Sequence, residues 1–441
     1  MGEYLLSVPI DATPKTDSKA SKVVEVISST ALNRIKLPGF HQEPNPAGGK
    51  MALFSTNEYF DRITKTKAAM HQKGIEVLVV CDPANMNYLT GYDGWSFYVP
   101  QAVLIIDDEE EPVWIGRMMD LNGARHTAFI KEENMIGYPE DYIQADVRHP
   151  MNFIGDYIKE KGWGGKTVGV ETDAYYYTAR SDSALKQSLG QDPLMDANLL
   201  VNWVRIVKSE AEIAMMKQAG IIAGNVMGTA LNHIRPGIRE CDAVAAVCQA
   251  QASGTPEFGG DYPAIVPMMP TGEKTSAPHL TWTDAPYQSN QAVNLELAGC
   301  RNRYHCPIAR TAFIGSTPPE KLQRLADITV EGLNLTLDAI RPGMTGEDVE
   351  KVWRKHIARH GFEKKSRIGY AMGLNYPPDW GEHTASLRPG DKTVLAPNMT
   401  FHMILGMWMD DFGFECSESF RVTDTGAETF ADCERKLFTI E

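Results

Sequence analysis

The sequence predicts an α+β protein in which a smaller α/β domain precedes a larger C-terminal domain built from two similar halves. Three observations lead to this prediction. Helical and extended patterns alternate from Thr56 to about Lys208, as is typical of an α/β domain. A capping box, Ser209-x-x-Glu212, then opens a long helical stretch. Beyond it, the segments 231–242 and 337–348 carry one repeated pattern.

The N-terminal region divides into two parts. Residues 1–50 contain scattered lysines, serines and threonines and end near a P-N-P-A-G-G run, so we expect an extension of low order without a secretory apolar region. The α/β domain is expected over residues 51–208. It should begin with a capped helix at Thr56, and a loop through Asp82-Pro83 should follow its first strand. The expected strands are Val77–Val80, Ala102–Asp107 and Val113–Gly116.

The C-terminal domain is expected over residues 209–441, and its internal repeat predicts its architecture. The first copy reads L-N-H-I-R-P-G-I and the second reads L-D-A-I-R-P-G-M, so Pro236 recurs as Pro342, an offset of 106 residues. Each copy predicts a helix, an R-P-G turn, a second helix and then strands. A solenoid needs at least about three copies, so two halves around one cleft are the better interpretation.

Composition excludes several classes of function. Among 441 residues, 43 basic and 57 acidic side chains give a net charge of −14, and no basic run is present, which argues against nucleic acid or an anionic membrane as a partner. No apolar run approaches the roughly 18 residues that span a bilayer. Seven cysteines without C-x-x-C spacing indicate neither a disulfide framework nor a structural zinc site. We therefore expect a reducing, cytoplasmic location.

The stretch 293–311 carries the densest set of reactive side chains. Val293, Leu295 and Leu297 alternate with polar or small residues, so Glu296 lies within an apolar strand and faces its opposite side. The Ala298-Gly299 pair is expected to turn the chain before a second extended segment. This pattern is compatible with a catalytic carboxylate and equally with a structural ion pair to a nearby arginine.

At these residues the chain resembles the creatinase and aminopeptidase P superfamily, whose catalytic domain has the pita-bread fold. The matching hairpin in that superfamily carries two aspartates that hold metal ions, and further ligands come from a G-H-G-x-G loop, an F-T-I-E-P strand and a final glutamate. Here I-A-R-T at 308–311, G-Y-A-M-G at 369–373 and F-H-M-I-L from Phe401 occupy these places. Only the carboxylate of Glu296 remains, because the other four positions are Pro307, Tyr370, Ile404 and Ser417. The resemblance therefore implies a member without a metal or other cofactor.

A second resemblance, to the ectoine hydrolases, covers the chain from about Met51 to its end. It is carried by L-T-G-Y-D-G-W-S-F-Y-V, F-G-G-D-Y-P-A-I-V-P, S-A-P-H-L-T-W, Y-H-C-P, Y-P-P-D-W-G-E, S-L-R-P-G-D and R-K-L-F, in this order. It implies a hydrolase that opens the cyclic amidinium ring of ectoine, and also of hydroxyectoine, to N-acetyl-diaminobutyrate. Such a protein would be a homodimer, and a deacetylase would act downstream.

Several further residues are candidates for the site. His279 follows a proline and matches a superfamily histidine that moves protons, although it also fits a core histidine. Aromatic faces suit an amidinium, but each aromatic also fits a core. Arg310 and Arg388 are alternatives for binding the substrate carboxylate. The remaining candidates for substrate binding are Trp95, Phe97, Tyr98, Asp261, Tyr262, Tyr304, His305, Tyr370, Asp379, Trp380 and Glu382.

The chemistry expected from these residues needs no metal. The ring carbon of an amidinium is already electrophilic, so an ionised Glu296 would attack it or activate water, while His279 passes a proton to the departing nitrogen. Two alternatives remain open. One is a creatinase-like hydrolase of another small amidine or guanidine, and the other is a binding module without catalysis.

Overall fold

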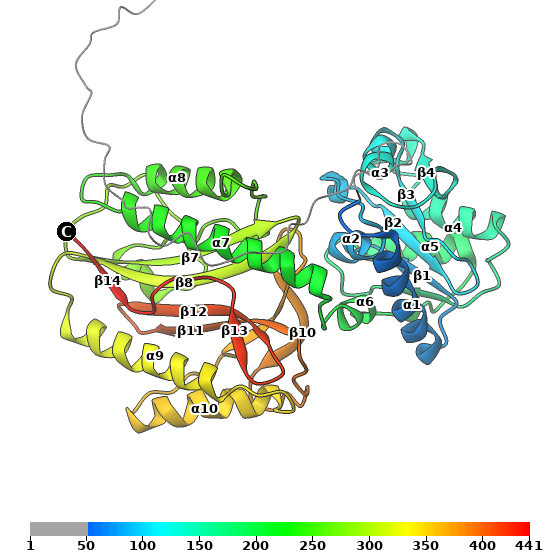
Figure 1. The fold of residues 1–441 in the computed structure, drawn as a ribbon. Helices are drawn as coiled ribbons and strands as arrows, with labels where there is room; N and C mark the ends of the chain where they lie inside the picture. Colours follow the sequence, from blue (N-terminus) through cyan, green and yellow to red (C-terminus); the bar gives the residue numbers. More distant parts are fainter. Residues whose placement is uncertain (1–51) are drawn as a thin grey trace, which may run out of the picture. The chain divides into compact units, whose positions relative to one another are not determined.

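The computed structural model describes residues 52–441, in an N-terminal and a C-terminal domain (Figure 1). The extension predicted over residues 1–50 lies outside this range. All seven cysteines lie within it, and all are free thiols. No helix in residues 52–441 has the length and hydropathy required to cross a bilayer.

The N-terminal domain is a mixed six-stranded sheet in the order β4-β3-β2-β1-β5-β6. The pairs β1–β2 and β2–β3 are antiparallel, whereas β3–β4, β1–β5 and β5–β6 are parallel. Its strands are β1 (Val77–Val80), β2 (Ala102–Ile106), β3 (Val113–Arg117), β4 (Met135–Tyr138), β5 (Val168–Val170) and β6 (Met195–Asp196). Its helices are α1 (Thr56–Lys73), α2 (Pro83–Thr90), α3 (Leu121–Thr127), α4 (Pro150–Glu160), α5 (Ala179–Leu189) and α6 (Leu200–Val204).

The predicted helix at Thr56 and the three predicted strands are present. Ser55 caps α1, because its side chain accepts a hydrogen bond from the Glu58 N–H. The loop expected through Asp82-Pro83 is wrong, because Pro83 begins helix α2 and Asp82 caps it with bonds from the Ala84 and Asn85 N–H groups. Proline is tolerated at the first helical position, because the backbone N–H that it lacks would have no hydrogen-bond acceptor within the helix. The segment 91–99, which contains Trp95, Phe97 and Tyr98, therefore follows a helix and not a strand.

Two helical pairs of the C-terminal domain match the predicted repeat: α7 (Glu210–His233) with α8 (Glu240–Ser253), and α9 (Glu320–Ala339) with α10 (Gly346–Arg359). The arginines of the two R-P-G turns make similar contacts. Nη1 of Arg235 donates to the carbonyls of Leu231 and Ile234, and Nη1 of Arg341 donates to those of Asp338 and Ile340. Each arginine thus satisfies carbonyls that the end of a helix leaves free.

The strands of this domain form two sheets between the helical pairs (Figure 1). One has the order β14-β8-β7 and the other the order β10-β9-β11-β12-β13. Helix α7 contacts β7 and β8, and α9 contacts β11 and β12. The strands are β7 (Gln291–Arg301), β8 (Tyr304–Ile314), β9 (Gly369–Met372), β10 (Gly381–Leu387), β11 (Thr400–Trp408), β12 (Gly413–Val422), β13 (Ala427–Thr429) and β14 (Leu437–Ile440).

The turn predicted at Ala298-Gly299 is wrong. Strand β7 continues through both residues, and the chain turns at Asn302 and Arg303, whose φ angles of 48° and 67° fit a two-residue hairpin turn. Gly299 is needed for close packing and not for a turn. A Cβ atom there would lie 2.1 Å from the carbonyl oxygen of Ala219, so glycine allows the backbone of α7 to approach the strand.

Candidate active site

Glu296 lies on the face of β7 that points toward the second sheet. In the register of the hairpin Glu296 pairs with Ala309, and Leu295 pairs with Arg310. Directly paired residues share a face, so Asn294, Glu296 and Ala309 project on one side. The side chain of Ser417 on β12 meets this face, because its Oγ accepts a hydrogen bond of 2.6 Å from the Ala309 N–H. Glu296 is therefore positioned between the two halves of the domain.

The carboxyl group of Glu296 is buried in apolar surroundings. The residue is 8% exposed, and its carboxyl makes no hydrogen bond to any residue within 52–441. A small cluster of Ala264, Met268, Ala298 and Trp380 packs beside it, with Ile265 and Tyr370 against that cluster. The backbone of Glu296 pairs with that of Met268 through two hydrogen bonds of 2.9 and 3.1 Å, which holds this cluster against the strand.

These surroundings raise the pKa of Glu296 well above its usual value. Burial is the largest cause, followed by the negative charges of Glu415 and Asp379. The protonated form of Glu296 is therefore favoured when no cation is bound. The sequence led us to expect an ionised Glu296, because it gave no sign of Glu415 and did not show that Asp379 lies close enough to raise this pKa.

Glu415 on β12 is the second buried carboxyl of the site. It accepts hydrogen bonds from the indole N–H of Trp408 at 2.9 Å and from Nδ2 of Asn294 at 3.3 Å. Burial raises its pKa to about 6, while these hydrogen bonds and the charge of Lys364 oppose the rise. The hydrogen bonds favour ionisation of Glu415, so the first proton of the pair resides on Glu296.

A chain of hydrogen bonds joins Tyr370, His402 and Ser417. The Tyr370 hydroxyl accepts from the indole N–H of Trp380 at 2.7 Å and lies 2.9 Å from Nδ1 of His402. Nε2 of His402 lies 2.8 Å from the Ser417 hydroxyl. Burial lowers the pKa of His402 to about 3, so the ring is neutral and serves as an acceptor at one nitrogen and a donor at the other. The negative charge of Glu296 raises the pKa of Tyr370, after burial.

The side chains around Glu296 do not fit a metal centre. The superfamily ligand positions hold Pro307, Tyr370, Ile404 and Ser417, and the hydroxyls of Tyr370 and Ser417 are bonded to His402. Glu296 belongs to no group of three or more His, Cys, Asp or Glu side chains, within residues 52–441, whose ligand atoms lie within 4.8 Å of one another. Metal sites in proteins need such converging donors.

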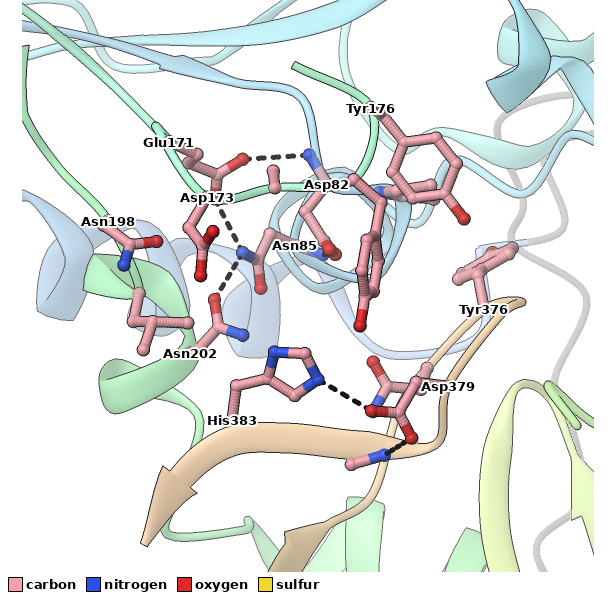
Figure 2. A pocket seen from close by; sticks show the side chains of 16 residues that line it. Asp82, Asn85, Glu171, Asp173, Tyr176, Asn198, Asn202, Tyr376, Asp379 and His383 are labelled. Atoms are coloured by element: carbon pink, nitrogen blue, oxygen red, sulfur yellow. Dashed lines mark hydrogen bonds and ion pairs between the residues drawn. The ribbon is translucent and has the colours of Figure 1, made fainter. Parts of the chain in front are cut away.

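Asp379 connects this site to a small cavity of about 40 Å³ (Figure 2). Figure 2 shows Asp379 receiving a 2.7 Å hydrogen bond from Nε2 of His383 on one side of the cavity, while Asn85 binds Glu171 and Asn202 on the other. Burial raises the pKa of Asp379, but the bonds from His383 and the Gly381 N–H outweigh it and lower the pKa. Asp379 is therefore ionised. The cavity has room for a few water molecules but not for a substituted ring.

Arg367 supplies an exposed cation next to Tyr370. Its guanidinium carbon lies 4.5 Å from the centre of the Tyr370 ring, and Nη1 donates to the Ser386 hydroxyl at 3.2 Å. Its charge lowers the pKa of His402, after burial. Among the described residues it forms no ion pair, so most of its donors are available. A cation and the carboxyl of Glu296 thus lie near the same tyrosine.

Glu382 belongs to a buried ion cluster and not to the pocket. Its carboxylate is 2.8 Å from Nζ of Lys208 through both oxygens and 3.5 Å from Nη1 of Arg205. All three side chains are at most 1% exposed. The predicted substrate contact of Glu382 is therefore corrected to a structural role.

Arg310 and Tyr304 project from the opposite face of the hairpin, away from Glu296. All five N–H donors of Arg310 are used, by Glu418 at 2.6 Å and by the carbonyls of Ala309, Ser417, Cys433 and Glu434. The Tyr304 hydroxyl donates to Glu212 on α7 at 2.9 Å. Neither residue has a free group for a ligand, which corrects both assignments. Arg388 is exposed just beyond β10.

His305 and Asp261 hold backbone segments in place. Nε2 of the fully buried His305 accepts from the Ala264 N–H at 2.8 Å, and Nδ1 lies 3.4 Å from the Gly373 carbonyl. Burial lowers the pKa of His305 to about 4, which keeps the ring neutral. Asp261 accepts a hydrogen bond from the Asn302 N–H at the hairpin turn. Both residues position the 258–267 segment, and neither makes a hydrogen bond to Glu296 within residues 52–441.

The aromatic candidates of the N-terminal domain form a cluster with Tyr262. The Trp95 ring lies 4.6 Å from that of Tyr262 and 4.9 Å from that of Phe97. The guanidinium of Arg303 stacks 3.6 Å from the centre of the Tyr262 ring and pairs with Asp93. Trp95 remains 56% exposed and Tyr98 69% exposed. The structure therefore brings Trp95, Phe97 and Tyr262 together and leaves Tyr98 outside the cluster.

His279 is not brought to Glu296 within the chain. It is exposed in the loop between the short helix Gly272–Ser276 and β7, has a φ angle of 67° and makes no hydrogen bond to another described residue. The sequence placed it near the site only through its resemblance to a superfamily histidine. Its role in proton transfer stays a prediction.

Three residues of the site were missed by sequence reasoning, namely Arg367, His402 and Glu415. A signal existed for His402, because Ile404 two residues later was assigned to the pocket and alternate strand residues share a face. The same alternation places Glu415 beside Ser417. Arg367 follows a short basic run just before the G-Y-A-M-G segment, which is a weak signal for a carboxylate-binding cation.

A buried carboxyl between two similar α+β halves, preceded by a mixed α/β domain, defines the creatinase and prolidase class of hydrolases. The sequence matches the Creatinase/Prolidase N-terminal domain over residues 62–207 and the Metallopeptidase family M24 over residues 214–425. The chain is 43% identical to the ectoine hydrolase of Halomonas elongata, over 87% of this chain and 98% of that protein. It is 44% identical to the uncharacterized hydrolase/peptidase y4tM of Sinorhizobium fredii, with the same two coverages.

Solved structures agree on the fold. A recombinant prolidase from Thermococcus sibiricus superposes with a TM-score of 0.74 at 19% identity, over 87% of this chain and 99% of that one. The Xaa-Pro dipeptidase from Bacillus anthracis gives 0.72 at 21% identity, over 87% and 100%. The chain therefore belongs to the M24 family of creatinase and prolidase type. The predicted fold, the resemblance to ectoine hydrolases and the assignment as a hydrolase of C–N bonds are confirmed.

Proposed function

We propose that this protein hydrolyses the cyclic amidine ring of ectoine, and also that of hydroxyectoine, to N-acetyl-2,4-diaminobutyrate without a metal ion. The observation that carries the proposal is the carboxyl of Glu296, which is buried among apolar groups without a hydrogen-bond partner in the described chain. Such a group requires a ligand that supplies positive charge or N–H donors. The identity of 43% to a protein named ectoine hydrolase indicates which ligand of that chemistry is bound.

The raised pKa of Glu296 supports recognition of a cation. An amidinium placed beside the carboxyl stabilises its ionised form, so binding lowers the pKa and a proton leaves. The ionised Glu296 then faces the electrophilic ring carbon. A neutral or anionic molecule would not stabilise the ionised form of Glu296. The pocket therefore favours molecules with a cationic group, and the same attraction converts Glu296 to its reactive, ionised form.

The carboxylate of the substrate needs a partner on the other side of the pocket. Arg310 has no free donor, whereas Arg367 is exposed, uses one donor on Ser386 and stacks on Tyr370. A guanidinium binds a carboxylate through two parallel hydrogen bonds. With Arg367 at the carboxylate and Glu296 at the amidinium, the two charges of the zwitterion determine its orientation across Tyr370.

Hydrolysis adds the elements of water to one ring C–N bond. Either Glu296 attacks the ring carbon and water later releases the acyl group, or Glu296 removes a proton from water that attacks directly. In both routes the ring C–N bond breaks, the oxygen stays on the acetyl carbon and the departing nitrogen takes a proton. We assign that proton transfer to His279, which must then be covered by the substrate or by a second subunit. The acetylated product requires a deacetylase as the next enzyme.

Turnover of ectoine in the presence of a chelator tests the proposal. We expect the purified protein to convert ectoine to the N-acetylated product, followed by proton NMR, at an undiminished rate after exhaustive treatment with EDTA. Creatine serves as the control substrate for the creatinase alternative and should remain intact. If chelation abolished turnover and added Mn²⁺ restored it, the metal-free assignment would be wrong. If no small amidine were turned over, a binding module would be the better interpretation.

Replacing Arg367 tests recognition of the carboxylate. We expect Arg367→Ala to raise the KM for ectoine about 10- to 100-fold while kcat changes less, because a charge-assisted bidentate pair contributes about 1.5–3 kcal/mol. Arg367→Lys should recover part of the lost affinity, since lysine keeps the positive charge but cannot form two parallel hydrogen bonds to a carboxylate. The matched control is Arg388→Ala, which removes an exposed arginine beyond β10 and should leave KM near its original value. An unchanged KM in Arg367→Ala would remove this residue from the site.

We further propose a homodimer in which the aromatic segment 91–99 contributes to the partner's site. Trp95 and Tyr98 are exposed aromatic residues, and Met118 and Met119 of the same domain are exposed as well. Exposed apolar patches often mark interfaces. Subunits carrying Trp95→Ala, which are inactive in this proposal, are mixed with Glu296→Gln subunits. One intact site per heterodimer should then restore up to about half of the activity per dimer. If Trp95 instead contributes to the site of its own chain, next to Tyr262, no site in the heterodimer will contain both Trp95 and Glu296. Activity will then not recover even though the exchange of subunits is confirmed.

A further inference from the structure

Three potential metal ligands converge on the outer helices of the C-terminal domain, away from Glu296. Glu331 lies on α9, His356 lies on α10 and His360 caps the C-terminus of α10. One potential ligand atom from each lies within 4.8 Å of the other two. Within residues 52–441 no other set of three or more His, Cys, Asp or Glu side chains meets this distance.

The hydrogen bond of His356 prepares its ring for coordination. The residue is 5% exposed, and Nε2 lies 2.8 Å from the Ile328 carbonyl, to which it donates. In the neutral ring this bond leaves the lone pair on Nδ1, and Nδ1 makes no hydrogen bond to any described residue. Metal-binding histidines are commonly fixed in this way by a carbonyl at the second nitrogen. A buried imidazole with a free lone pair is therefore available to a cation.

The other two ligands are accessible from solvent. The His360 ring centre is 5.0 Å from that of His356, as expected for residues one helical turn apart. His360 and Glu331 line an open groove of about 730 Å³ that also contains the carboxylates of Glu320 and Asp327 and one guanidinium, that of Arg324. A hydrated cation can therefore approach Glu331 and His360 through this groove, and a ligand atom of His356 lies within 4.8 Å of theirs.

We propose that Glu331, His356 and His360 bind a divalent transition metal, with Zn²⁺ as the representative ion. Two imidazoles and one carboxylate are a donor set that suits Zn²⁺, and water completes the tetrahedron. The ion would join α9 to α10 and so stabilise the second half of the domain. It would take no part in the reaction at Glu296.

Isothermal titration calorimetry with Zn²⁺ tests the proposal on the full chain, prepared without a histidine tag and stripped with a chelator. We expect one Zn²⁺ per chain. His360→Ala and Glu331→Gln should each weaken binding by about 10-fold or more, since losing even a supporting group of a metal site costs that much. Both positions are accessible, so these variants should fold normally. Zn²⁺ should also raise the Tm of the original protein but not that of His360→Ala.

Two controls make the outcomes decisive. His233→Ala removes an exposed histidine at the end of α7 and should leave Zn²⁺ binding unchanged. Glu296→Gln should also bind Zn²⁺ normally, and His360→Ala should retain turnover of ectoine, which separates this site from the proposed reaction. Wild-type binding in both ligand variants, absence of binding in the original protein, or loss of binding in Glu296→Gln would each overturn the assignment.

Discussion

Replacing Glu296 by glutamine is expected to reduce turnover of ectoine by several orders of magnitude while binding persists. The amide keeps the size of the carboxyl but can neither attack the ring carbon nor accept a proton from water. Binding and turnover are measured separately, by calorimetry on the variant and by NMR of the product. A variant with wild-type turnover would remove Glu296 from the mechanism.

The aspartate variant distinguishes positioning from charge. Glu296→Asp retains the carboxyl but withdraws it by about 1.5 Å, the length of one carbon–carbon bond. A near-attack geometry requires reacting atoms about 3–3.5 Å apart, so we expect this variant to fail nearly as badly as the glutamine variant. A purely structural carboxyl would give lower stability and near-normal turnover in the folded fraction.

Isotope labelling distinguishes the two possible roles of Glu296. Turnover in oxygen-18 water is followed by mass spectrometry of the peptide that contains Glu296. Water that attacks an acyl-enzyme at the glutamate carbon leaves the label in the protein. A general base leaves the peptide unlabelled, and this result would exclude that covalent route.

Removing the charge of Glu382 is expected to lower the free energy of unfolding by about 3–5 kcal/mol, because it leaves buried cations without their partner. In Glu382→Gln, Lys208 and Arg205 remain at 1% side-chain exposure without the carboxylate that they share. Burial already lowers the pKa of Lys208, which shows how strongly its charge depends on Glu382. Unfolding by urea, followed by circular dichroism, measures the loss.

Two comparisons identify the source of this loss. Glu382→Gln combined with Lys208→Met should recover part of the stability, because an apolar side chain removes the unpaired charge. Asp411→Asn breaks the exposed pair with Lys321 and should change stability little. If Glu382 contacted the substrate, the single variant would instead keep its stability and show a raised KM.

The fold was predictable because its signals are local or repeated. The R-P-G turns recur at a fixed offset. The first joins α7 to α8 and the second joins α9 to α10. The capping box at Ser209 begins α7 with the expected reciprocal hydrogen bonds. The strand with Glu296 follows from alternation alone. Such features depend on neighbouring residues, so one sequence is sufficient to reveal them.

The contents of the pocket were less predictable, because they depend on residues far apart in the chain. Glu415 raises the pKa of Glu296 across 119 positions of sequence, from another sheet, and no pattern links the two residues. Arg310 looked free in the sequence, but the C-terminal carbonyls of Cys433 and Glu434 occupy its donors. The turn was wrongly predicted at Gly299. A glycine that allows a helix to pack closely against a strand cannot be distinguished in the sequence from a glycine in a turn.

If Arg367 and Glu296 bind the two ends of the substrate as proposed, their unequal exposure has a consequence for the salt dependence of the reaction. Dissolved ions screen charges beyond about 8 Å at physiological ionic strength, but they act only where solvent reaches. Arg367 is exposed and loses attraction for a carboxylate as salt rises, whereas Glu296 is buried and keeps its attraction for an amidinium. Added salt should therefore weaken capture of the substrate, seen in KM, and leave the chemical step nearly unchanged. An enzyme of this design would work in concentrated salt as long as its substrate is abundant.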